Sequence, residues 1–424
     1  MIKKIFSSAF WRMAASACSF FSVPVLLEKI GVDDYAVWVT LTSLIGWLSL
    51  FDFGAGYSLR NRIAESKALN ETTALETVMK GNFTFFCINA LFALVVFGGS
   101  LCFVDIFKNY TLLAVLLYVP FIVSFPTFLG PFIYQGLGRI PEMNFLQFLP
   151  QFLWLVFIFA FRGLTNDKLL VLCIGFTSIQ LVLRLILFVR AMRYLNMPFK
   201  GMFSMGCLKE TADSLKSGVR FLMLQLSSLV LFSLGNVVTY SHLPLSDVSR
   251  YDVVNKIFIL LIALFNNVIT VFWTEISKAK AVGDGEKLNG LWRKLYLMTL
   301  GINVVIGIFV PTIPWFLNYW TVGKITVSLP LLWWFLAQFS IQSLAYAGGV
   351  FLNAFEILKW QIIISVIAAA SFLPVSVFVF NHGVGISGVP MSVCLVLIPS
   401  LIYTFVSSRH CVNNVRCRCN KTLS

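Results

Sequence analysis

Charged residues are scarce in this sequence: Asp, Glu, Lys and Arg make up 12% of its 424 residues. Soluble domains average about 25% charged residues, whereas 58% of the residues here are hydrophobic. This leaves too little polar surface to cover a water-soluble globule, so lipid must be the solvent for most of the chain. The composition therefore predicts an all-α polytopic membrane protein, because helices satisfy their own backbone hydrogen bonds in lipid.

Motifs for chemistry are also missing. The sequence has no P-loop, no HExxH motif, no nucleophile elbow and no paired carboxylates in a soluble segment. Cys417 and Cys419 lack the CxxC spacing of a zinc site, and the cysteines imply no disulfide framework. We therefore expect no enzymatic activity, no cofactor and no metal. Energy would come from an ion gradient or from the gradient of the substrate.

Acidic residues are outnumbered, since 32 Lys and Arg against 18 Asp and Glu give a net charge of +14. The basic residues lie between apolar runs, where they act as topology signals, and no nucleic-acid partner is expected. Crossing the membrane takes about 20 apolar residues, which predicts about twelve spans. They lie near residues 10–30, 36–58, 82–104, 111–137, 145–163, 168–189, 219–241, 251–276, 295–316, 327–352, 361–380 and 386–407. If both termini are cytoplasmic, most Lys and Arg residues lie in segments on the cytoplasmic side of the membrane, which favours this orientation.

Two pairs of loop segments predict an internal repeat. Tyr35 in IGVDDYAVW matches Tyr251 in LSDVSRYDVV, and Gln135 in YQGLGRIPEMN matches Asn353 in FLNAFEILKWQ at nearly the same offset. Each half holds six spans, so the repeat is parallel and places a transport path between the halves. The predicted domains are an N-terminal lobe (1–190), a cytoplasmic linker (191–218), a C-terminal lobe (219–407) and a basic tail (408–424). The alternative is chance similarity between short loops.

The eighth span carries a polar stripe on one helical face. Its members are Asp252, Asn255, Lys256, Asn266, Asn267, Thr270 and Thr274. A hydrated cavity explains such a stripe, and hydrogen bonding between helices is the alternative. Asp252 and Lys256 are spaced to pair along the helix, either at the surface near the outer boundary or in a functional role. Gln225 and Asn236 add polar groups to the seventh span.

Arginines gather in or near the cytoplasmic half of the predicted spans: Arg12, Arg60, Arg62, Arg184 and Arg220. The guanidinium fork suits phosphate oxygens, so these residues are candidates to bind an anionic phospho-substrate. Arg184 can instead extend to the cytoplasmic interface. Asp52 ends the second span and is a candidate coupling-ion site, or a partner of Arg60 or Arg62. Pro120, Pro126 and Pro131 predict a kink in the fourth span.

Several segments resemble Wzx-type O-antigen flippases of the multidrug/oligosaccharidyl-lipid/polysaccharide (MOP) exporter superfamily. They are KKIFSSAFWR with VPVLLEKIGVDDYAVW, FDFGAGYSLRNRIAE, YQGLGRIPEMN, RYDVVNKIF and FWTEISKAKAVGDGEKL. The resemblance implies two six-helix lobes around a cationic cavity in the bacterial inner membrane. It also implies transfer of undecaprenyl-diphosphate-linked oligosaccharide from the cytoplasmic to the periplasmic leaflet during lipopolysaccharide biosynthesis. Arg12, Asp52, Arg60 and Lys256 match positions where such proteins carry charge.

The flippase hypothesis has two rivals. A multidrug or cation antiporter of the same superfamily would need acidic groups deep in the cavity, and few lie at that depth here. A membrane enzyme such as an O-antigen polymerase would carry long extracytoplasmic loops, and none is visible. For a flippase, the expected partners are the lipid-linked oligosaccharide, membrane lipids, a polysaccharide polymerase and a chain-length regulator.

Overall fold

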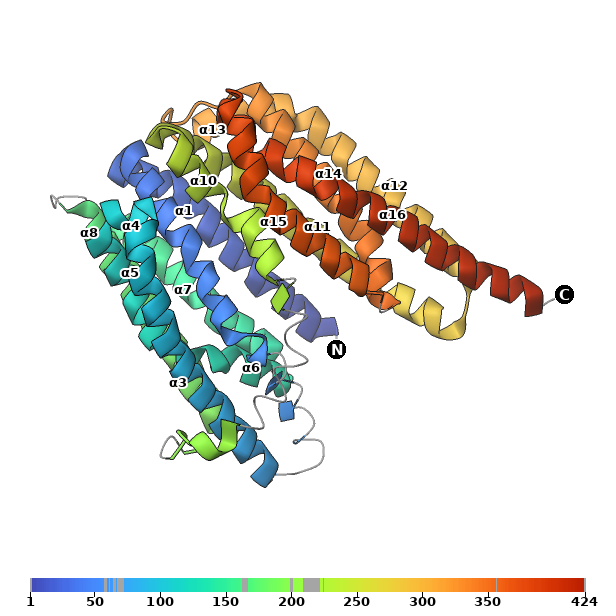
Figure 1. The fold of residues 1–424 in the computed structure, drawn as a ribbon, viewed down its shortest axis with the longest axis horizontal. Coiled ribbons are helices and arrows are strands. Elements are labelled where there is room, and N and C mark those ends of the chain that lie inside the picture. Colours follow the sequence, from blue (N-terminus) through green and yellow to red (C-terminus); the bar gives the residue numbers. More distant parts are fainter. Residues whose placement is uncertain are drawn as a thin grey trace. The chain divides into compact units, whose positions relative to one another are not determined.

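The computed structural model describes residues 2–56, 59–60, 62–63, 66, 72–161, 167–198, 201–208, 222–223, 225–355 and 357–422. Within these ranges the regular structure is helical, without a strand. The chain divides into two compact units, unit 1 (Met1–Gln225) and unit 2 (Leu226–Ser424), each a bundle of helices (Figure 1).

Unit 1 begins with a long helix that contains the first predicted span and most of the second. Helix α1 (Ile2–Ser43) continues as the 3₁₀ helix η1 (Leu44–Asp52), and the axis breaks at Gly31 with φ 87° and ψ 178°. Only glycine adopts this conformation readily. The remaining elements are α3 (Thr72–Phe103), α4 (Asp105–Asn109), α5 (Thr111–Val123), η2 (Phe125–Phe128), α6 (Leu129–Gly136), α7 (Ile140–Ala160), α8 (Lys168–Tyr194) and η3 (Met205–Cys207).

The predicted kink in the fourth span is confirmed. Helix α5 and the segment Phe125–Gly136 form a pair bent by 64°. Pro126 lies in the first turn of η2, just after the break, where its missing N–H removes a helical hydrogen bond. The bend therefore places η2 at the centre of a broken span.

Aromatic packing joins the helices of unit 1. Trp38 of α1 stacks on Trp154 of α7 with ring centroids 5.2 Å apart, and Phe176 of α8 meets both rings edge-on. The buried Tyr118 hydroxyl donates a hydrogen bond to the Leu41 carbonyl oxygen, which links α5 to α1. Stacked and edge-on rings stabilise such contacts beyond the area they bury.

Unit 2 is built around one buried helix. Its elements are α10 (Gly235–His242), α11 (Leu245–Val282), α12 (Gly285–Phe309), η4 (Val310–Thr312), α13 (Ile313–Trp320), α14 (Leu329–Ala354), α15 (Lys359–Asn381), η5 (Gly385–Ser387) and α16 (Gly388–Thr422). In the most apolar stretch of α14, 67% of the residues are buried, whereas in that of Gly285–Trp320 only 11% are. Helices α14 and α16 approach closely at Gly348, because a Cβ there would lie 2.6 Å from the Thr404 carbonyl oxygen.

The polytopic membrane architecture is confirmed. Among the described residues, eight helices are long and apolar enough to cross a membrane, or nine if the bent pair is one span. The first of them, Phe10–Asp52, covers two predicted spans. Helix α11 contains the predicted eighth span, and residues 222–223, residues 225–233 and α10 contain described parts of the seventh. The described helices thus account for the predicted spans, which number about twelve if each takes about 20 residues.

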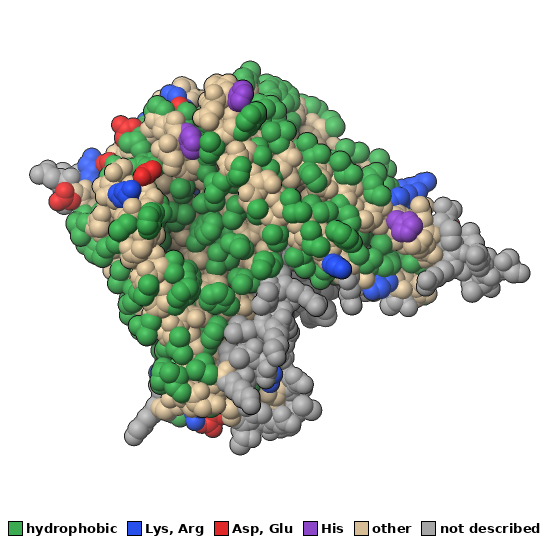
Figure 2. Space-filling model, viewed as in Figure 1, with side chains coloured by type: hydrophobic (Ala, Val, Ile, Leu, Met, Phe, Trp, Pro, Cys, Tyr) green, Lys and Arg blue, Asp and Glu red, His purple; other side chains and the backbone are tan. Residues whose placement is uncertain are grey.

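Exposed side chains on both units are largely apolar, as a lipid solvent requires. On the face shown in Figure 2, hydrophobic side chains cover most of the described helices, with Lys, Arg, Asp and Glu near the helix ends. The two tyrosines matched in the predicted repeat, Tyr35 and Tyr251, are both buried within their own units. Residues 408–422, predicted as a tail, continue α16.

Candidate functional site

Unit 2 contains a cluster of polar side chains at the start of α11. The Asp252 carboxylate accepts a hydrogen bond from Nδ2 of Asn236 at 2.8 Å and forms an ion pair with Nζ of Lys256. Asp252 is only 3% exposed, whereas 27% of the Lys256 side chain is exposed. From the sequence alone, Asp252 and Lys256 could form either a surface pair or a functional pair. The structure shows that the carboxylate is buried inside unit 2.

A close contact between α10 and α11 forms this cluster. A Cβ on Gly235 would lie 2.0 Å from the hydroxyl oxygen of Tyr251, so only glycine allows the two helices to come this close. The contact places Asn236, the next residue, against Asp252. Removing one partner of a buried ion pair typically costs about 3–5 kcal/mol, because the other charge remains without compensation. The cluster therefore holds α10 and α11 together.

The described part of the α11 stripe beyond this cluster is less buried than the aromatic face of the helix. Phe258 and Phe265 are buried against Phe335 and Phe339 of α14. Asn255 is half-buried and Asn266 is exposed. The side chains of Asn267 and Thr270 lie outside the described residues, although their backbone is helical. The described part of the polar stripe is thus only partly covered, and Gln225, the last residue of unit 1, is half-buried as well.

In unit 1, Arg184 of α8 lies against the broken fourth span. Its guanidinium carbon is 3.9 Å from the ring centroid of Phe128 in η2 and 5.1 Å from that of Phe121 in α5. The Nη1 atom is buried and has no hydrogen-bond partner among the described residues. Cation–π contacts stabilise such a guanidinium by about 0.5–2 kcal/mol, but they leave its charge and its N–H donors in place. An anion that reached this position would find an unused fork of donors.

The other predicted basic residues are spread over unit 1. Arg12 is exposed on α1, and Arg60 and Arg62 are half-buried after η1. Arg220 lies outside the described residues. Asp52 is 5% exposed, and its Oδ1 accepts a hydrogen bond from the Gly54 N–H at 2.8 Å. It forms no salt bridge with Arg60, Arg62 or any other described residue.

A third polar cluster joins α6, α7 and α8 and has no counterpart in the sequence-based prediction. Glu142 accepts hydrogen bonds from the hydroxyls of Tyr194 at 2.8 Å and Tyr134 at 3.4 Å. Arg139 donates to the same carboxylate at 3.0 Å, and its guanidinium lies 3.7 Å from the ring centroid of Tyr194. The YQGLGRIPEMN segment, which the resemblance singled out, contains three of these four residues. Their roles depend on Tyr194, which is far away in sequence.

Comparisons with known proteins give relatives and structural neighbours, while no family model matches the chain. It is 21% identical over 299 residues to a protein of Salmonella typhimurium and 26% identical over 313 residues to one of Salmonella typhi. Both are named "Putative O-antigen transporter". The aligned stretches cover 68% of this chain in each case, and 65% and 66% of the relatives, which is just under two thirds of their length.

Solved structures share the fold over nearly the whole chain. An inward-facing multidrug resistance MATE family transporter of the MOP superfamily superposes with a TM-score of 0.75 at 12% identity, covering 96% of this chain and 99% of the neighbour. A MOP superfamily transporter from Pyrococcus furiosus gives a TM-score of 0.59 at 13% identity, covering 98% and 96%. The resemblance seen in the sequence is thereby confirmed: the chain has the fold of MOP superfamily transporters and is similar in sequence to proteins named as O-antigen transporters.

Proposed function

We propose that this chain is a flippase that moves undecaprenyl-diphosphate-linked O-antigen repeat units from the cytoplasmic to the periplasmic leaflet of the bacterial inner membrane. The observation that carries the proposal is the similarity, over 68% of the chain, to two proteins named as O-antigen transporters. The fold supports it, because the solved structures that superpose on the chain are membrane transporters.

In this proposal the arginines bind the diphosphate of the substrate. Arg184 is the strongest candidate, since its buried Nη1 lacks a hydrogen-bond partner among the described residues. Arginine can hold two phosphate oxygens at once, which a lysine does not do. The remaining candidates in this role are Arg12, Arg60, Arg62 and Arg220.

The glycan of the substrate would contact polar side chains along the seventh and eighth predicted spans. The candidates are Gln225, Asn255, Asn266, Asn267 and Thr270, while Asn236 and Lys256, which were predicted for the same path, are engaged by Asp252. Asn266 supports this role, because its side chain is exposed whereas Phe258 and Phe265 of the same helix are buried. The polyprenyl tail would remain in lipid while the two lobes alternate access between the leaflets.

Coupling to an ion gradient would use Asp52 rather than Asp252. Both carboxylates are buried, but Asp252 is already balanced by Lys256. Asp52 forms no salt bridge with another described residue, so its charge is open to neutralisation by a proton or a metal cation. The same residue is the feature that favours the rival function, a cation-coupled drug antiporter like the multidrug transporters among the structural neighbours.

A strain that lacks this gene separates the two functions. We expect this strain to lose its surface polysaccharide and to trap single undecaprenyl-linked units on the cytoplasmic face. The plasmid-borne gene should restore the surface polysaccharide. Units that reach the periplasmic face without being polymerised would point to a polymerase. Normal polysaccharide together with new sensitivity to cationic drugs would replace the flippase with the antiporter.

Co-purification with a polysaccharide polymerase and a chain-length regulator tests the proposed partners. Protease access to both termini tests their proposed cytoplasmic location.

A further inference from the structure

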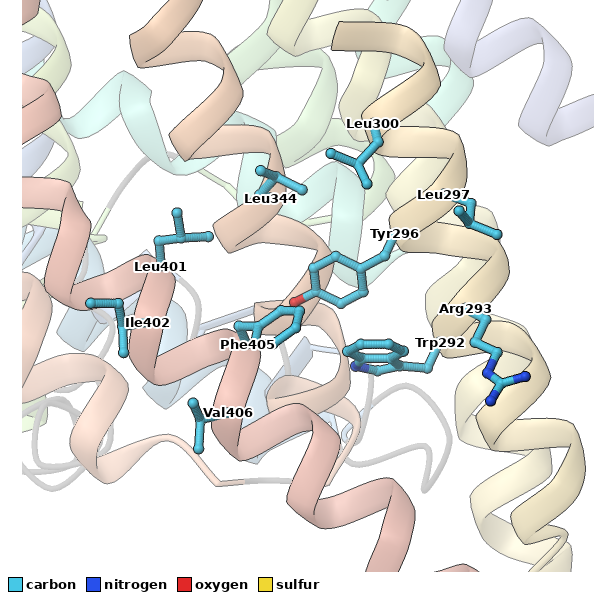
Figure 3. A pocket seen from close by; sticks show the side chains of 10 residues that line it. All are labelled: Trp292, Arg293, Tyr296, Leu297, Leu300, Leu344, Leu401, Ile402, Phe405 and Val406. Carbon is cyan, nitrogen blue, oxygen red and sulfur yellow. The ribbon is translucent and has the colours of Figure 1, made fainter. Parts of the chain in front are cut away.

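An apolar groove lies on unit 2 between α12, α14 and α16, away from the polar clusters described above. Its volume is about 650 Å³. Figure 3 shows Leu297 and Leu300 of α12 on one side and Leu401, Ile402 and Phe405 of α16 on the other. Trp292, Arg293, Tyr296, Leu344 and Val406 complete the lining, and Arg293 is the only charged residue in it. This size lies within the range of known ligand pockets.

Polar contacts fix α12 on both sides of the groove. At one level Nε1 of Trp292 donates to the Ser408 hydroxyl at 3.0 Å, which joins α12 to α16. At the other, Asn303 donates to the Ser343 hydroxyl at 3.1 Å and accepts from the Ser340 hydroxyl at 2.6 Å, which joins α12 to α14. The two levels are separated by about 16 Å along the helix, given a rise of 1.5 Å per residue. These hydrogen bonds therefore fix α12 against α16 at one level and against α14 at the other.

The groove opens toward lipid. Leu297 is 69% exposed and Ile402 is 58% exposed, and the α12–α13 segment is the least buried of the apolar spans. Within a membrane the exposed side of these helices meets hydrocarbon, so the apolar lining of the groove suits a hydrocarbon chain better than water. The lining residues of α12 run from Trp292 to Leu300, about 12 Å at 1.5 Å per residue, so the groove fits within one leaflet of a hydrocarbon core of about 30 Å.

A positive charge lies at one end. Arg293 is exposed, one residue after Trp292, and has no ion pair or hydrogen bond with a described residue. The nearby Arg409 is engaged, because it donates to Oδ1 of Asn289 at 2.7 Å and its guanidinium lies 4.8 Å from the Trp292 ring. An indole and a free guanidinium at the end of an apolar channel are typical of the membrane interface. The guanidinium is complementary in charge to a phosphate group at that depth.

We infer that this groove binds one acyl chain of an anionic membrane phospholipid whose phosphodiester lies against Arg293. The single free guanidinium matches the single negative charge of a phosphodiester. A diphosphate that carries a sugar would bring more charge and more polar groups than this end of the groove can meet. The bound chain would join α12 to α14 and α16 and so stabilise unit 2, whatever substrate the protein carries.

Lipid titration of the purified full-length protein tests the inference. Phosphatidylglycerol, the anionic probe, is compared with zwitterionic phosphatidylethanolamine, with bound lipid counted by native mass spectrometry and stability followed by thermal unfolding. We expect retention of one phosphatidylglycerol, a rise in the unfolding temperature with phosphatidylglycerol only, and about tenfold weaker binding in Arg293→Gln, at 1.4 kcal/mol per factor of ten. The matched control Lys294→Gln removes an exposed charge that does not line the groove and should bind normally.

A second pair of variants tests the apolar part of the groove. Leu300→Trp fills it and should abolish retention of the lipid, whereas Ile308→Trp, on the same helix but outside the groove, should not. Equal binding of the two phospholipids, or unchanged binding in Arg293→Gln, would overturn the inference. Displacement of phosphatidylglycerol by undecaprenyl diphosphate would also overturn it, since the occupant would then be the substrate lipid.

Discussion

Each unit holds an ionisable side chain with buried polar atoms within a predicted span, and the two units accommodate this charge differently. In unit 2 the Asp252 carboxylate is paired with Lys256 and hydrogen-bonded to Asn236. In unit 1 the Arg184 guanidinium lies on two phenylalanine rings, and its Nη1 has no hydrogen-bond partner among the described residues. Charge that is balanced inside one unit stabilises that unit. Charge that lacks an anion is available to a ligand, so the comparison assigns a structural role to one site and a binding role to the other.

The largest expected effect is on the stability of unit 2. Lys256→Met leaves the Asp252 carboxylate buried without its cation, and we expect it to lower the free energy of unfolding by about 3 kcal/mol. The double variant Asp252→Asn/Lys256→Met should recover most of this loss, because it removes both charges and leaves an acceptor for Asn236. Denaturant titration in detergent micelles measures both.

The control for this prediction lies on the same helix. Arg250 and Asp247 form a more exposed pair at 2.8 Å, and Arg250→Gln should cost at most about 1 kcal/mol. A Lys256→Met protein with normal stability but impaired transport would reverse the assignment and move the binding role to unit 2.

The next effect is on transport through Arg184. Arg184→Gln removes the charge and the donor fork, and we expect transfer of lipid-linked units to fall about 30-fold, which corresponds to about 2 kcal/mol of lost substrate binding. Arg184→Lys should be intermediate, since lysine keeps the charge but not the fork. The leaflet distribution of labelled units in reconstituted vesicles gives the rate.

Arg193 supplies the matched control, because it is exposed near the end of the same helix. Arg193→Gln should transport normally. If Arg184 had a purely structural role, Arg184→Gln would lose stability in proportion to its loss of transport. Rescue of transport by a stabilising substitution elsewhere in the chain would then argue against a binding role.

Local features of the fold could be predicted from the sequence. The three prolines predicted the bend in the fourth span, and the i, i+4 spacing in the eighth span predicted the pairing of Asp252 with Lys256. Both depend on residues close together in the chain. The alternation of apolar runs and basic loops likewise predicted the polytopic architecture.

Contacts between helices could not be predicted in this way. The position of Asn236 beside Asp252 depends on how closely α10 approaches α11, and the Glu142 cluster depends on Tyr194 from another helix. The lining of the groove beside Arg293 comes from three helices, so it depends on residues that are far apart in the sequence. Hydrophobic periodicity shows which face of a helix is buried, but not which neighbour covers it or at what distance.

The smallest expected effect tests the helix contact that forms the unit 2 cluster. Gly235→Ala places a methyl group where the Tyr251 hydroxyl lies, and this ring is buried and cannot move freely. We expect a loss of about 1–2 kcal/mol in the free energy of unfolding, typical of overpacking. Gly290→Ala is the matched control, because a Cβ on this exposed glycine of α12 meets nothing within 4 Å. Alanine is the better helix former by about 1 kcal/mol, so this control should stabilise the protein. Opposite signs in the same unfolding assay would show that the α10–α11 approach requires glycine, whereas a gain in both would mean that Asn236 reaches Asp252 without it.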